Sequence, residues 1–590
     1  MTEKKKNEGG SGNHIKLSVI LRLGSYLFRH PLPMILAAVI MVVSNVLALA
    51  APELSGHAID ALSLDGGVNF EKVFYYCALM AACYVVSAIL SYLLTYLMIR
   101  VSKKVTVEMR SELFDHLLEL PVSYFDGHQT GDIISHVSYD IDTINASLSN
   151  DLLQIFASAI MVIGSLVMML KIKPILVLVF AVTVPISVAF TRYKSVYVRP
   201  LFKKRSAKLG ILNGYAEEIL SGQKTVRSFH KEDVFLSRFD ERNRDAVNAY
   251  YEADYQACAI GPSVNFINNL SLALISMFGT ILYIFDKITP GNISTFILYS
   301  RKFAGPINEA ANIIAELQSA CAAAERVFAL IDMDPEKPDA PDAEILSGKG
   351  GDVGFRNVTF SYDGEKEILH DITFDAPEGS VVAIVGPTGS GKTTVINLLM
   401  RFYDIETGNI LLSDKPITSY TRDSSRAAFS MVLQDAWLFA GTVYDNIAYG
   451  KDNASEEEVY GAARAVGLED FILSLPDGYE TVISDNGSNL SKGQKQLITI
   501  ARAMVSDAKY LILDEATSNV DSRTELSIQT AMRALMKGKT CFVIAHRLST
   551  IQSADKIIVI RGGRIEESGT HDELLRMEGF YASLYLSQFR

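Results

Sequence analysis

The sequence is poor in cysteine and in positive charge, and both shortages exclude common classes of protein. Its five cysteines are scattered over 590 residues without a CxxC pair, which argues against a disulfide framework and against a zinc site. With 55 Lys and Arg against 67 Asp and Glu, the net charge is −12, so general nucleic-acid binding is disfavoured. No cleavable signal peptide is expected, because the first apolar run is too long and no A-x-A site follows it.

Long apolar runs occur only in about the first 320 residues. A bilayer core about 30 Å thick takes roughly 20 apolar helical residues. Six stretches approach this length, and we expect them to span a membrane: 33–51, 73–99, 152–170, 175–190, 264–285 and 293–314. They predict a helical membrane domain over residues 16–330, preceded by a disordered tail at 1–15 that is polar, basic and rich in Gly and Ser.

The placement of Lys and Arg predicts that both termini are cytoplasmic. Lys and Arg precede the first span and are frequent in the segments that follow the second and fourth spans, whereas the loop after the first span has no Lys or Arg before Lys72. The segments between spans two and three and between spans four and five are about 50 and 70 residues long, with few helix breakers. We expect them to be helical, to extend the spans well beyond the bilayer, and to reach a cytoplasmic domain.

Polar residues inside the expected spans are candidates for function by default. They are Asn265, Asn268 and Asn269 in the fifth span, and Tyr299, Arg301, Lys302 and Glu309 in the sixth. Two interpretations are open: these side chains pair between helices, or they line a cavity that contacts a substrate.

The composition changes after residue 333. Prolines at 335, 338 and 341, with mostly charged residues between them, predict a linker over 331–350. From 351 to 590, short β-rich runs alternate with helical runs, which predicts an α/β domain.

One segment of this domain fits the phosphate-binding pattern GxxxxGK[ST]: Gly386, Pro387, Thr388, Gly389, Ser390, Gly391, Lys392, Thr393 and Thr394. It follows an apolar strand at 381–385 and precedes a helical run at 395–402, and this context identifies a P-loop that binds ATP. Backbone N–H groups would surround the phosphates at the helix N-terminus. Lys392 would reach the β- and γ-phosphates, and the Thr393 hydroxyl would bind Mg²⁺.

A second segment ends the apolar run 510–513 with two carboxylates, Asp514 and Glu515. We expect Asp514 to hold the Mg²⁺ shell and Glu515 to polarise the attacking water. A buried strand that ends in acids by chance is the alternative, and the P-loop in the same domain disfavours it.

A third segment, Leu490-Ser491-Lys492-Gly493-Gln494, resembles the LSGGQ signature of ABC ATPases. Together with the two motifs above, it identifies the chain as a member of the ABC transporter superfamily. The resemblance implies that Ser491, Gly493 and Gln494 bind the nucleotide held on the P-loop of a second subunit.

The same resemblance implies four further roles. Tyr362 would stack on adenine, and Gln434 would sense Mg²⁺ and the membrane domain. His546 would contact the γ-phosphate, and Asp521 would belong to the D-loop between the two ATPase domains.

Six spans ahead of one ATPase domain is the order of an exporter half in this family. The implied fold is a six-helix membrane domain with long cytoplasmic extensions, fused to an α/β P-loop ATPase domain of ABC type. Tyr124-Phe125-Asp126 in the first long loop and Glu217-Glu218 in the second resemble the segments that couple the two domains in the family.

Three departures from the family pattern concern one face of the ATPase domain. Lys492 stands where a glycine is usual, residues 518–521 read Ser-Asn-Val-Asp, and residues 484–487 read Ser-Asp-Asn-Gly. Lys392, Asp514, Glu515 and His546 are intact. This combination resembles the catalytic-glutamate subunit of heterodimeric bacterial multidrug exporters, in which one ATP site hydrolyses and the other is degenerate. The alternative is a homodimer that tolerates Lys492.

We therefore expect MgATP-driven export of amphipathic compounds, namely drugs and also lipids or peptides, across the cytoplasmic membrane. The expected partners are a second exporter half and the lipid bilayer, with no nucleic acid. A homodimeric lipid flippase is the alternative. A soluble ATPase acting on DNA is disfavoured, because only 122 residues (514 − 392) separate Lys392 from Asp514 and no heptad run lies between them.

Overall fold

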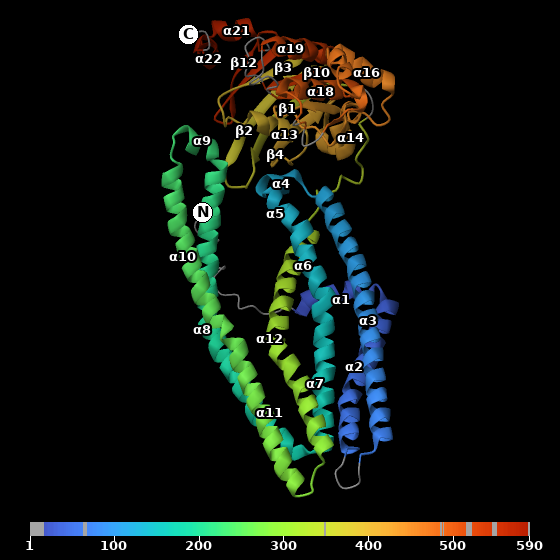
Figure 1. The fold of residues 1–590 in the computed structure, drawn as a ribbon. Helices are drawn as coiled ribbons and strands as arrows, with labels where there is room; N and C mark the ends of the chain where they lie inside the picture. The colour runs from blue at the N-terminus through green and yellow to red at the C-terminus, as the bar shows by residue number, and fades with distance from the viewer. Residues whose placement is uncertain are drawn as a thin grey trace. The chain divides into compact units, whose positions relative to one another are not determined.

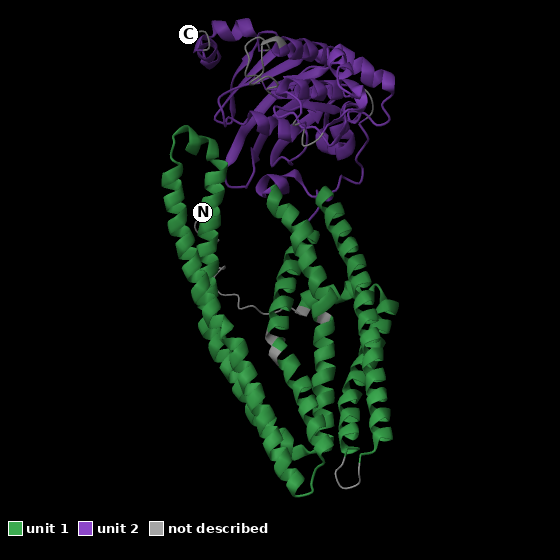
Figure 2. Ribbon diagram, viewed as in Figure 1, with its two compact units in different colours: residues 1–118, 130–333 green, residues 119–129, 334–590 purple. Residues whose placement is uncertain are grey.

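The computed structural model describes residues 17–62, 68–346, 350–483, 487, 489–514, 522–544 and 551–587. The chain forms two compact units, residues 1–118 with 130–333, and residues 119–129 with 334–590 (Figure 2). The short helix α4 (Val122–Gly127), which lies between α3 and α5 in the chain, thus belongs to the second unit.

The first unit is helical throughout its described part (Figure 1). Its elements are α1 (Leu17–Phe28), α2 (Pro31–Asp60), α3 (Phe70–Glu119), α5 (Thr130–Ser135), η2 (His136–Asp140), α6 (Ile141–Ala146), η3 (Ser147–Asp151), α7 (Leu152–Ile172), α8 (Pro174–Ser221), α9 (Gln223–Ser228), α10 (Glu232–Cys258), α11 (Ile260–Ile284) and α12 (Pro290–Ile331). The two long segments between the expected spans are helical, as the sequence predicts.

Five helices in the described ranges are long and apolar enough to cross a membrane: Pro31–Asp60, Phe70–Glu119, Thr130–Ile172, Pro174–Ser221 and Glu232–Ile284. The expected sixth span, 293–314, lies in α12 and is not among them. Arg301, Lys302 and Glu309 interrupt the apolar residues of α12 and lower its hydropathy. A sixth crossing therefore stays a prediction.

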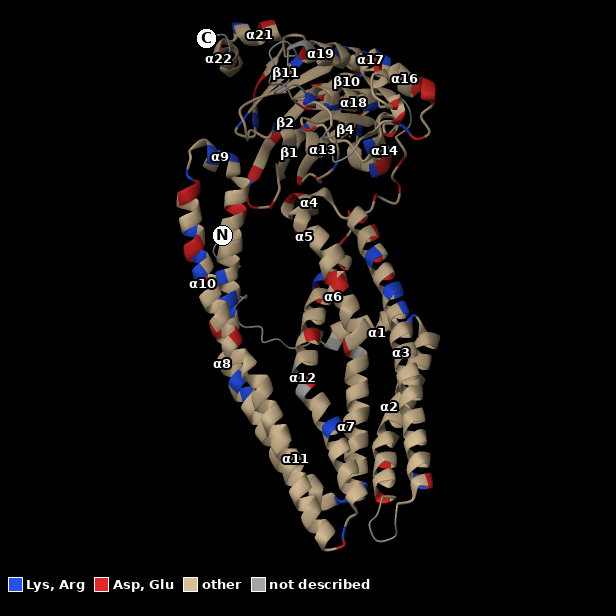
Figure 3. Cartoon of the chain, in the orientation of Figure 1, with Lys and Arg blue, Asp and Glu red and all other residues tan. Residues whose placement is uncertain are grey.

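Charge distinguishes the two neighbours of α8. Lys and Arg alternate with Asp and Glu along α10, and the adjoining part of α8 is mainly basic, whereas α11 carries no charged residue (Figure 3). Three ion pairs join α8 to α10: Lys204–Glu252 at 2.9 Å, Arg205–Asp254 at 2.7 Å and Lys208–Asp245 at 2.5 Å. Each exposed pair contributes roughly 0–1 kcal/mol, so they align the two helices rather than hold the unit together.

Helices α2 and α12 approach closely through small residues. A Cβ on Gly291 would lie 2.1 Å from the Gly56 carbonyl oxygen, so only glycine fits there. Two hydroxyls of α12 bond backbone carbonyls of α2: Thr295 donates to Pro52 at 3.0 Å, and the buried Tyr299 donates to Leu49 at 2.6 Å. Small residues and hydroxyl hydrogen bonds are the usual means of holding apolar helices together in a membrane.

The second unit contains two main sheets and a two-stranded ribbon. An antiparallel sheet has the order β2-β1-β4-β5, with β1 (Val353–Ser361), β2 (Glu367–Ala376), β4 (Thr407–Leu412) and β5 (Lys415–Pro416). The six-stranded sheet has the order β12-β11-β3-β10-β9-β6, with β3 (Val381–Val385), β6 (Phe429–Val432), β9 (Tyr510–Asp514), β10 (Thr540–Ile544), β11 (Lys556–Arg561) and β12 (Arg564–Gly569). The ribbon pairs β7 (Gly441–Thr442) with β8 (Val482–Ile483).

The six-stranded sheet is parallel except for β12. Its central strands are almost wholly buried, because alternate side chains enter separate cores on the two faces. The helices of this unit are α13 (Lys392–Leu399), α14 (Arg422–Ala427), α15 (Val443–Ala448), α16 (Glu456–Ala465), α17 (Glu469–Leu473), α18 (Lys492–Val505), α19 (Ser522–Met536), α21 (His571–Arg576) and α22 (Phe580–Ser587). Helices α15, α16, α18 and α19 share one core with the sheet, and α13 and the antiparallel sheet share the other.

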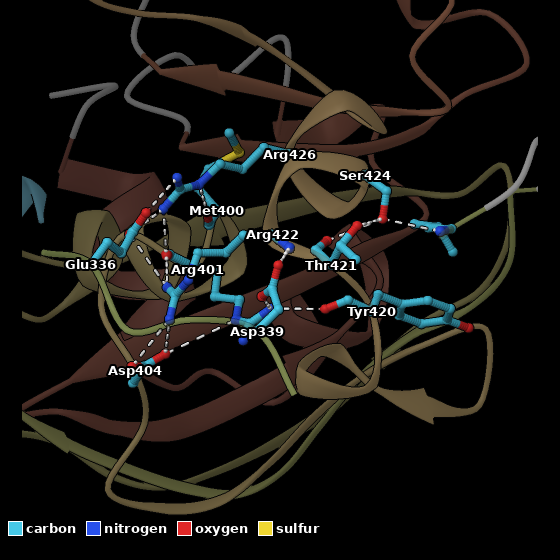
Figure 4. A network of polar contacts seen from close by, with 11 residues as sticks. Glu336, Asp339, Met400, Arg401, Asp404, Tyr420, Thr421, Arg422, Ser424 and Arg426 are labelled. Atoms are coloured by element: carbon cyan, nitrogen blue, oxygen red, sulfur yellow. Dashed lines mark hydrogen bonds and ion pairs between the residues drawn. The ribbon is translucent and has the colours of Figure 1, made fainter. Parts of the chain in front are cut away.

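Three arginines bind the proline-rich segment that opens the second unit (Figure 4). Arg426 holds both carboxylate oxygens of Glu336, at 2.6 and 3.0 Å. Asp339 accepts from the Arg422 backbone N–H at 2.9 Å and from the Arg401 guanidinium at 3.2 Å. Burial, reinforced by the charge of Arg422, lowers the pKa of Arg401. The linker is therefore fastened to the α/β fold by charge-assisted hydrogen bonds.

Candidate functional site

The loop between β3 and α13 depends on glycine at several positions. Gly391 has a φ of +102°, and a Cβ there would lie 2.6 Å from Cδ2 of Leu369. A Cβ on Gly386 would lie 2.1 Å from the Ile560 carbonyl oxygen, and Gly389 has a φ of +80°. Larger residues would force the loop away from the sheet, so the glycines keep its backbone against the N-terminus of α13.

Two polar side chains of this loop fit a phosphate. The Ser390 hydroxyl is buried and has no hydrogen-bond partner among the described residues. The Lys392 ammonium donates to the carbonyl oxygens of Gly386 at 2.9 Å and Pro387 at 3.0 Å, so it lies within the loop. A phosphate at this helix N-terminus would satisfy the orphaned hydroxyl and pair with the ammonium. The predicted loop residues are thus brought together as a nucleotide site requires.

The strand register brings the other predicted phosphate and magnesium residues to the same edge of the sheet. In the parallel ladder Ile384 of β3 pairs with Ile544 of β10, which pairs with Asp514 of β9. Strand β6 pairs with β9 up to Val432, and the exposed Gln434 follows two residues later. Carboxyl ends of parallel strands meet at one edge, where α/β sheets bind ligands. Helix α13 follows the carboxyl end of β3, and its second residue, Thr393, is exposed.

Tyr362 presents a half-exposed ring that its neighbours hold in place. Its hydroxyl donates to Oγ1 of Thr394 at 3.1 Å and accepts from Nδ2 of Asn397 at 3.3 Å, which ties the ring to the P-loop helix. Tyr403 packs edge-to-face on it at 4.8 Å. A fixed aromatic ring beside a phosphate loop offers the stacking surface that a nucleobase needs.

The signature segment begins α18. Ser491 is the N-cap in a capping box with Gln494: its backbone N–H donates to the Gln494 side chain at 2.8 Å, and its hydroxyl accepts from the Gln494 backbone at 3.3 Å. Gly493 is buried in the first turn, and Lys492 is exposed at the first helical position. The helix N-terminus is thus well formed, with a lysine side chain at its open end.

Helix α18 also fixes the segment that carries Gln434. Gln496 donates to the Leu433 carbonyl oxygen at 3.3 Å. Arg502 donates to the carbonyl oxygens of Trp437 at 3.1 Å and Asn446 at 2.8 Å. The signature helix and the Q-loop therefore share hydrogen bonds, so a displacement of one is felt by the other.

Comparison with known proteins agrees with this geometry. Two family models match, "ABC transporter transmembrane region" over residues 34–307 and "ABC transporter" over residues 369–518. A solved structure of a bacterial Atm1-family ABC exporter with ATP bound superposes with a TM-score of 0.78 and 32% identity, covering 94% of this chain and 98% of that one. The chain belongs to the ABC exporters. Its helical membrane domain and ABC ATPase domain are as the sequence predicts, and its transport is coupled to an ATPase.

Relatives of this ABC exporter have differing names. An uncharacterised ABC transporter ATP-binding protein of Bacillus subtilis, YfiC, is 40% identical over 96% of this chain and 94% of its own length. A fatty acid ABC transporter ATP-binding/permease protein of Mycobacterium bovis is 42% identical over 87% of this chain and 81% of its own length. An ATP-dependent lipid A-core flippase of Vibrio vulnificus is 36% identical over 83% of this chain and 84% of its own length.

Three predicted site residues of the exporter lie outside the described ranges: Glu515, Asp521 and His546. The strands that lead to two of them are described, since β9 ends at Asp514 and β10 ends at Ile544. Their roles stay predictions.

The sequence did not single out Tyr403, which the structure places against the ring of Tyr362. Its hydroxyl donates to Asp126 of α4 at 2.5 Å, while its ring supports Tyr362. The available signal was an aromatic pair, Phe402-Tyr403, which follows shortly after the end of α13 at Leu399. The expected coupling segment around Asp126 is thus bonded to a residue that positions the predicted adenine platform.

Proposed function

We propose that this chain is one half of a heterodimeric ABC exporter that moves amphipathic compounds, drugs among them, outward across the cytoplasmic membrane. The observation that carries the ATP-dependent part is the P-loop, in which the orphaned Ser390 hydroxyl and the Lys392 ammonium line a cradle that only glycine permits. Because a membrane domain precedes the ATPase domain in the same chain, we infer that ATP hydrolysis drives export.

The residues of this chain divide the work at the nucleotide. Ser390 and Lys392 hold the phosphates, and Tyr362 holds the base. Thr393, Gln434 and Asp514 would hold Mg²⁺, which when bound neutralises the phosphate charge. Glu515 orients the attacking water, and His546 contacts the γ-phosphate.

The signature of this chain serves the other nucleotide of the dimer. Ser491, Gly493 and Gln494 would face the phosphates on the partner half, with Asp521 beside them. Closure of the two ATPase domains around both nucleotides would change the membrane domain from an inward-facing to an outward-facing conformation. To drive that change nearly to completion, ATP must favour the closed dimer by about 5.5 kcal/mol.

The heterodimer is supported by Lys492. A lysine at the open end of α18 places a mobile side chain where a glycine would leave only backbone. That change suits a nucleotide site that binds without fast hydrolysis, while Lys392, Asp514, Glu515 and His546 serve the hydrolytic one.

The test is ATPase activity in lipid, first with this chain alone and then with a second exporter half co-expressed and co-purified. We expect activity and a stable two-chain complex only in the second case. An active dimer of this chain alone would overturn the heterodimer.

The second candidate is a homodimeric lipid flippase, which the printed names of the Vibrio and Mycobacterium relatives favour. Reconstituted vesicles separate the two: a flippase of one chain would move a labelled lipid between leaflets with ATP and without any partner.

The proposed topology has both termini and the ATPase domain in the cytoplasm, following the basic residues before the first expected span and after the second and fourth. Protease added to right-side-out vesicles should leave the second unit intact and should cut it in inverted vesicles.

A further inference from the structure

The first unit contains a polar cavity of about 860 Å³ between α2, α3, α12 and the region where η3 continues into α7. Its volume lies in the range of sites for drug-sized molecules. Its polar lining includes Ser44, Asn45, Ser87, Ser91, Thr95, Asn150, Asp151, Gln154, Glu309, Asn312 and Glu316. No Lys, Arg or His lines it, so its charge is wholly negative.

A hydrogen bond between α7 and α12 and the helical repeat of α12 place the carboxylates of this cavity. Gln154 donates to Oε2 of Glu309 at 3.1 Å. Glu316 lies seven residues further along α12, two turns away on the same face, and lines the cavity together with Asp151 of η3. The two acidic side chains of α12 thus project into one space, about 10 Å apart along the helix.

Asp151 lacks a basic partner although it is buried. The residue is 8% exposed, and no Lys, Arg or His forms an ion pair with its carboxylate among the described residues. The acid Glu316 lies beside it in the lining of the cavity. A buried carboxylate without a counter-charge costs several kcal/mol unless a ligand, a cation or a proton supplies the missing partner.

Four other polar side chains around the cavity already donate elsewhere. Ser44 and Ser87 bond each other's backbone carbonyls, at 3.1 and 3.0 Å. Asn45 donates to Met41, and Thr95 donates to Ser91. These donors are committed to backbone carbonyls of α2 and α3, so they do not neutralise the carboxylates.

We propose that this cavity is the substrate site of the exporter and that it selects organic cations, with Asp151, Glu309 and Glu316 binding the positive group. The inference rests on the proposed export function and adds the charge of the substrate. In a low-dielectric membrane domain three carboxylates attract an ammonium or amidinium strongly and repel a fatty acid or a phosphorylated lipid. The names of the fatty acid and lipid A relatives therefore describe substrates of the wrong charge for this cavity.

The test uses two probes of one shape and opposite charge, tetraphenylphosphonium and tetraphenylborate. Binding and stimulation of ATPase are measured on the purified transporter, with its partner half if that is required for activity. The wild type should bind the cation at least about tenfold more tightly than the anion, given the usual strength of charge discrimination. Equal binding, or preference for the borate, would overturn the inference without any variant.

Isosteric variants assign the effect to residues. Asp151→Asn, Glu309→Gln and Glu316→Gln should each weaken tetraphenylphosphonium binding by about tenfold, the cost of one well-placed charge pair, and should improve borate binding. The matched control is Glu53→Gln, an exposed acid of α2 that does not line the cavity, and it should change neither. Unchanged cation binding in all three cavity variants would overturn the assignment.

Basal ATP turnover distinguishes this inference from the proposed function. Turnover that persists in the cavity variants and is lost in Glu515→Gln supports an ATP-driven exporter, whatever its substrate charge. Cation selectivity that is absent while such turnover is present contradicts the cation site alone. Absence of ATP turnover in the wild-type complex contradicts the proposed function itself.

Discussion

The phenolic hydroxyl of Tyr403 donates a hydrogen bond to Oδ2 of Asp126 at 2.5 Å. Burial and the Asp126 carboxylate raise the pKa of Tyr403, so the phenol remains a donor throughout the working pH range. The ring of Tyr403 meets that of Tyr362 edge-to-face, at 86°. Helix α4, the adenine platform and the P-loop helix are therefore joined by three successive side-chain contacts.

This relay predicts that Tyr403→Phe will uncouple transport from ATP turnover. Phenylalanine keeps the ring that supports Tyr362 and removes the bond to Asp126. Basal turnover and the KM for ATP should stay within about threefold of wild type, which is less than 1 kcal/mol. Stimulation of ATPase by transported compounds should fall, because α4 lies in the chain between the membrane helices α3 and α5.

A double-mutant cycle with Asp126→Ala tests whether the bond itself is responsible. A hydrogen bond to a charged group contributes about 1.5–3 kcal/mol, and both single variants remove the same one. The double variant should consequently be no worse than either single variant. Additive losses would show that the two residues act separately.

Local motifs made much of the ATP site predictable, and distance along the chain explains what was missed. The sequence predicts the segments 386–394 and 510–514, because their strands, loops and helices follow one another within a few residues. Tyr403 and Asp126 are 277 residues apart, and no periodicity connects them.

The cavity carboxylates illustrate the same limit. Glu309 was noted as a polar residue of an expected span, whereas Asp151 and Glu316 fell just outside the spans. Their pairing depends on how α12 packs against α7, which no local pattern encodes. Arg301 and Lys302 were noted for the same reason as Glu309, and they do not line the polar cavity.

Glu515→Gln should nearly abolish ATP turnover and preserve ATP binding. Glutamine keeps the shape of the side chain but removes the base, which for proton-transfer catalysis costs about 100-fold or more. Phosphate release and equilibrium binding of a fluorescent ATP analogue, measured on the same preparation, separate the two steps. Substantial residual turnover would remove Glu515 from the role assigned to it.

Lys492→Gly examines which nucleotide site the signature serves. If this signature faces a degenerate site, restoring glycine should leave turnover within about threefold, since that site does not limit the cycle. A large gain in turnover would instead show that both sites hydrolyse, and would favour the homodimer. Lys495→Gly, one turn further along α18, controls for the general loss of a lysine from the helix.

The linker clamp predicts a loss of stability when Glu336 is changed to Gln. Arg426 holds Glu336 at 2.6 Å, so removing the charge leaves this guanidinium without its carboxylate, while Arg422, with 8% of its side chain exposed, keeps Asp404 at 3.1 Å. We expect a loss of about 2 kcal/mol, less than for a fully buried pair because Glu336 itself is partly exposed, and a fall of about 5 °C in the melting temperature of the ATPase unit. Lys337→Ala is the matched control: its side chain is 81% exposed and its ion pair with Asp404 spans 3.7 Å, so its removal should change stability by less than about 0.5 kcal/mol. Equal melting temperatures for Glu336→Gln and Lys337→Ala would mean that the clamp does not fasten the linker, because only the Glu336 change removes the counter-charge of a partly buried arginine.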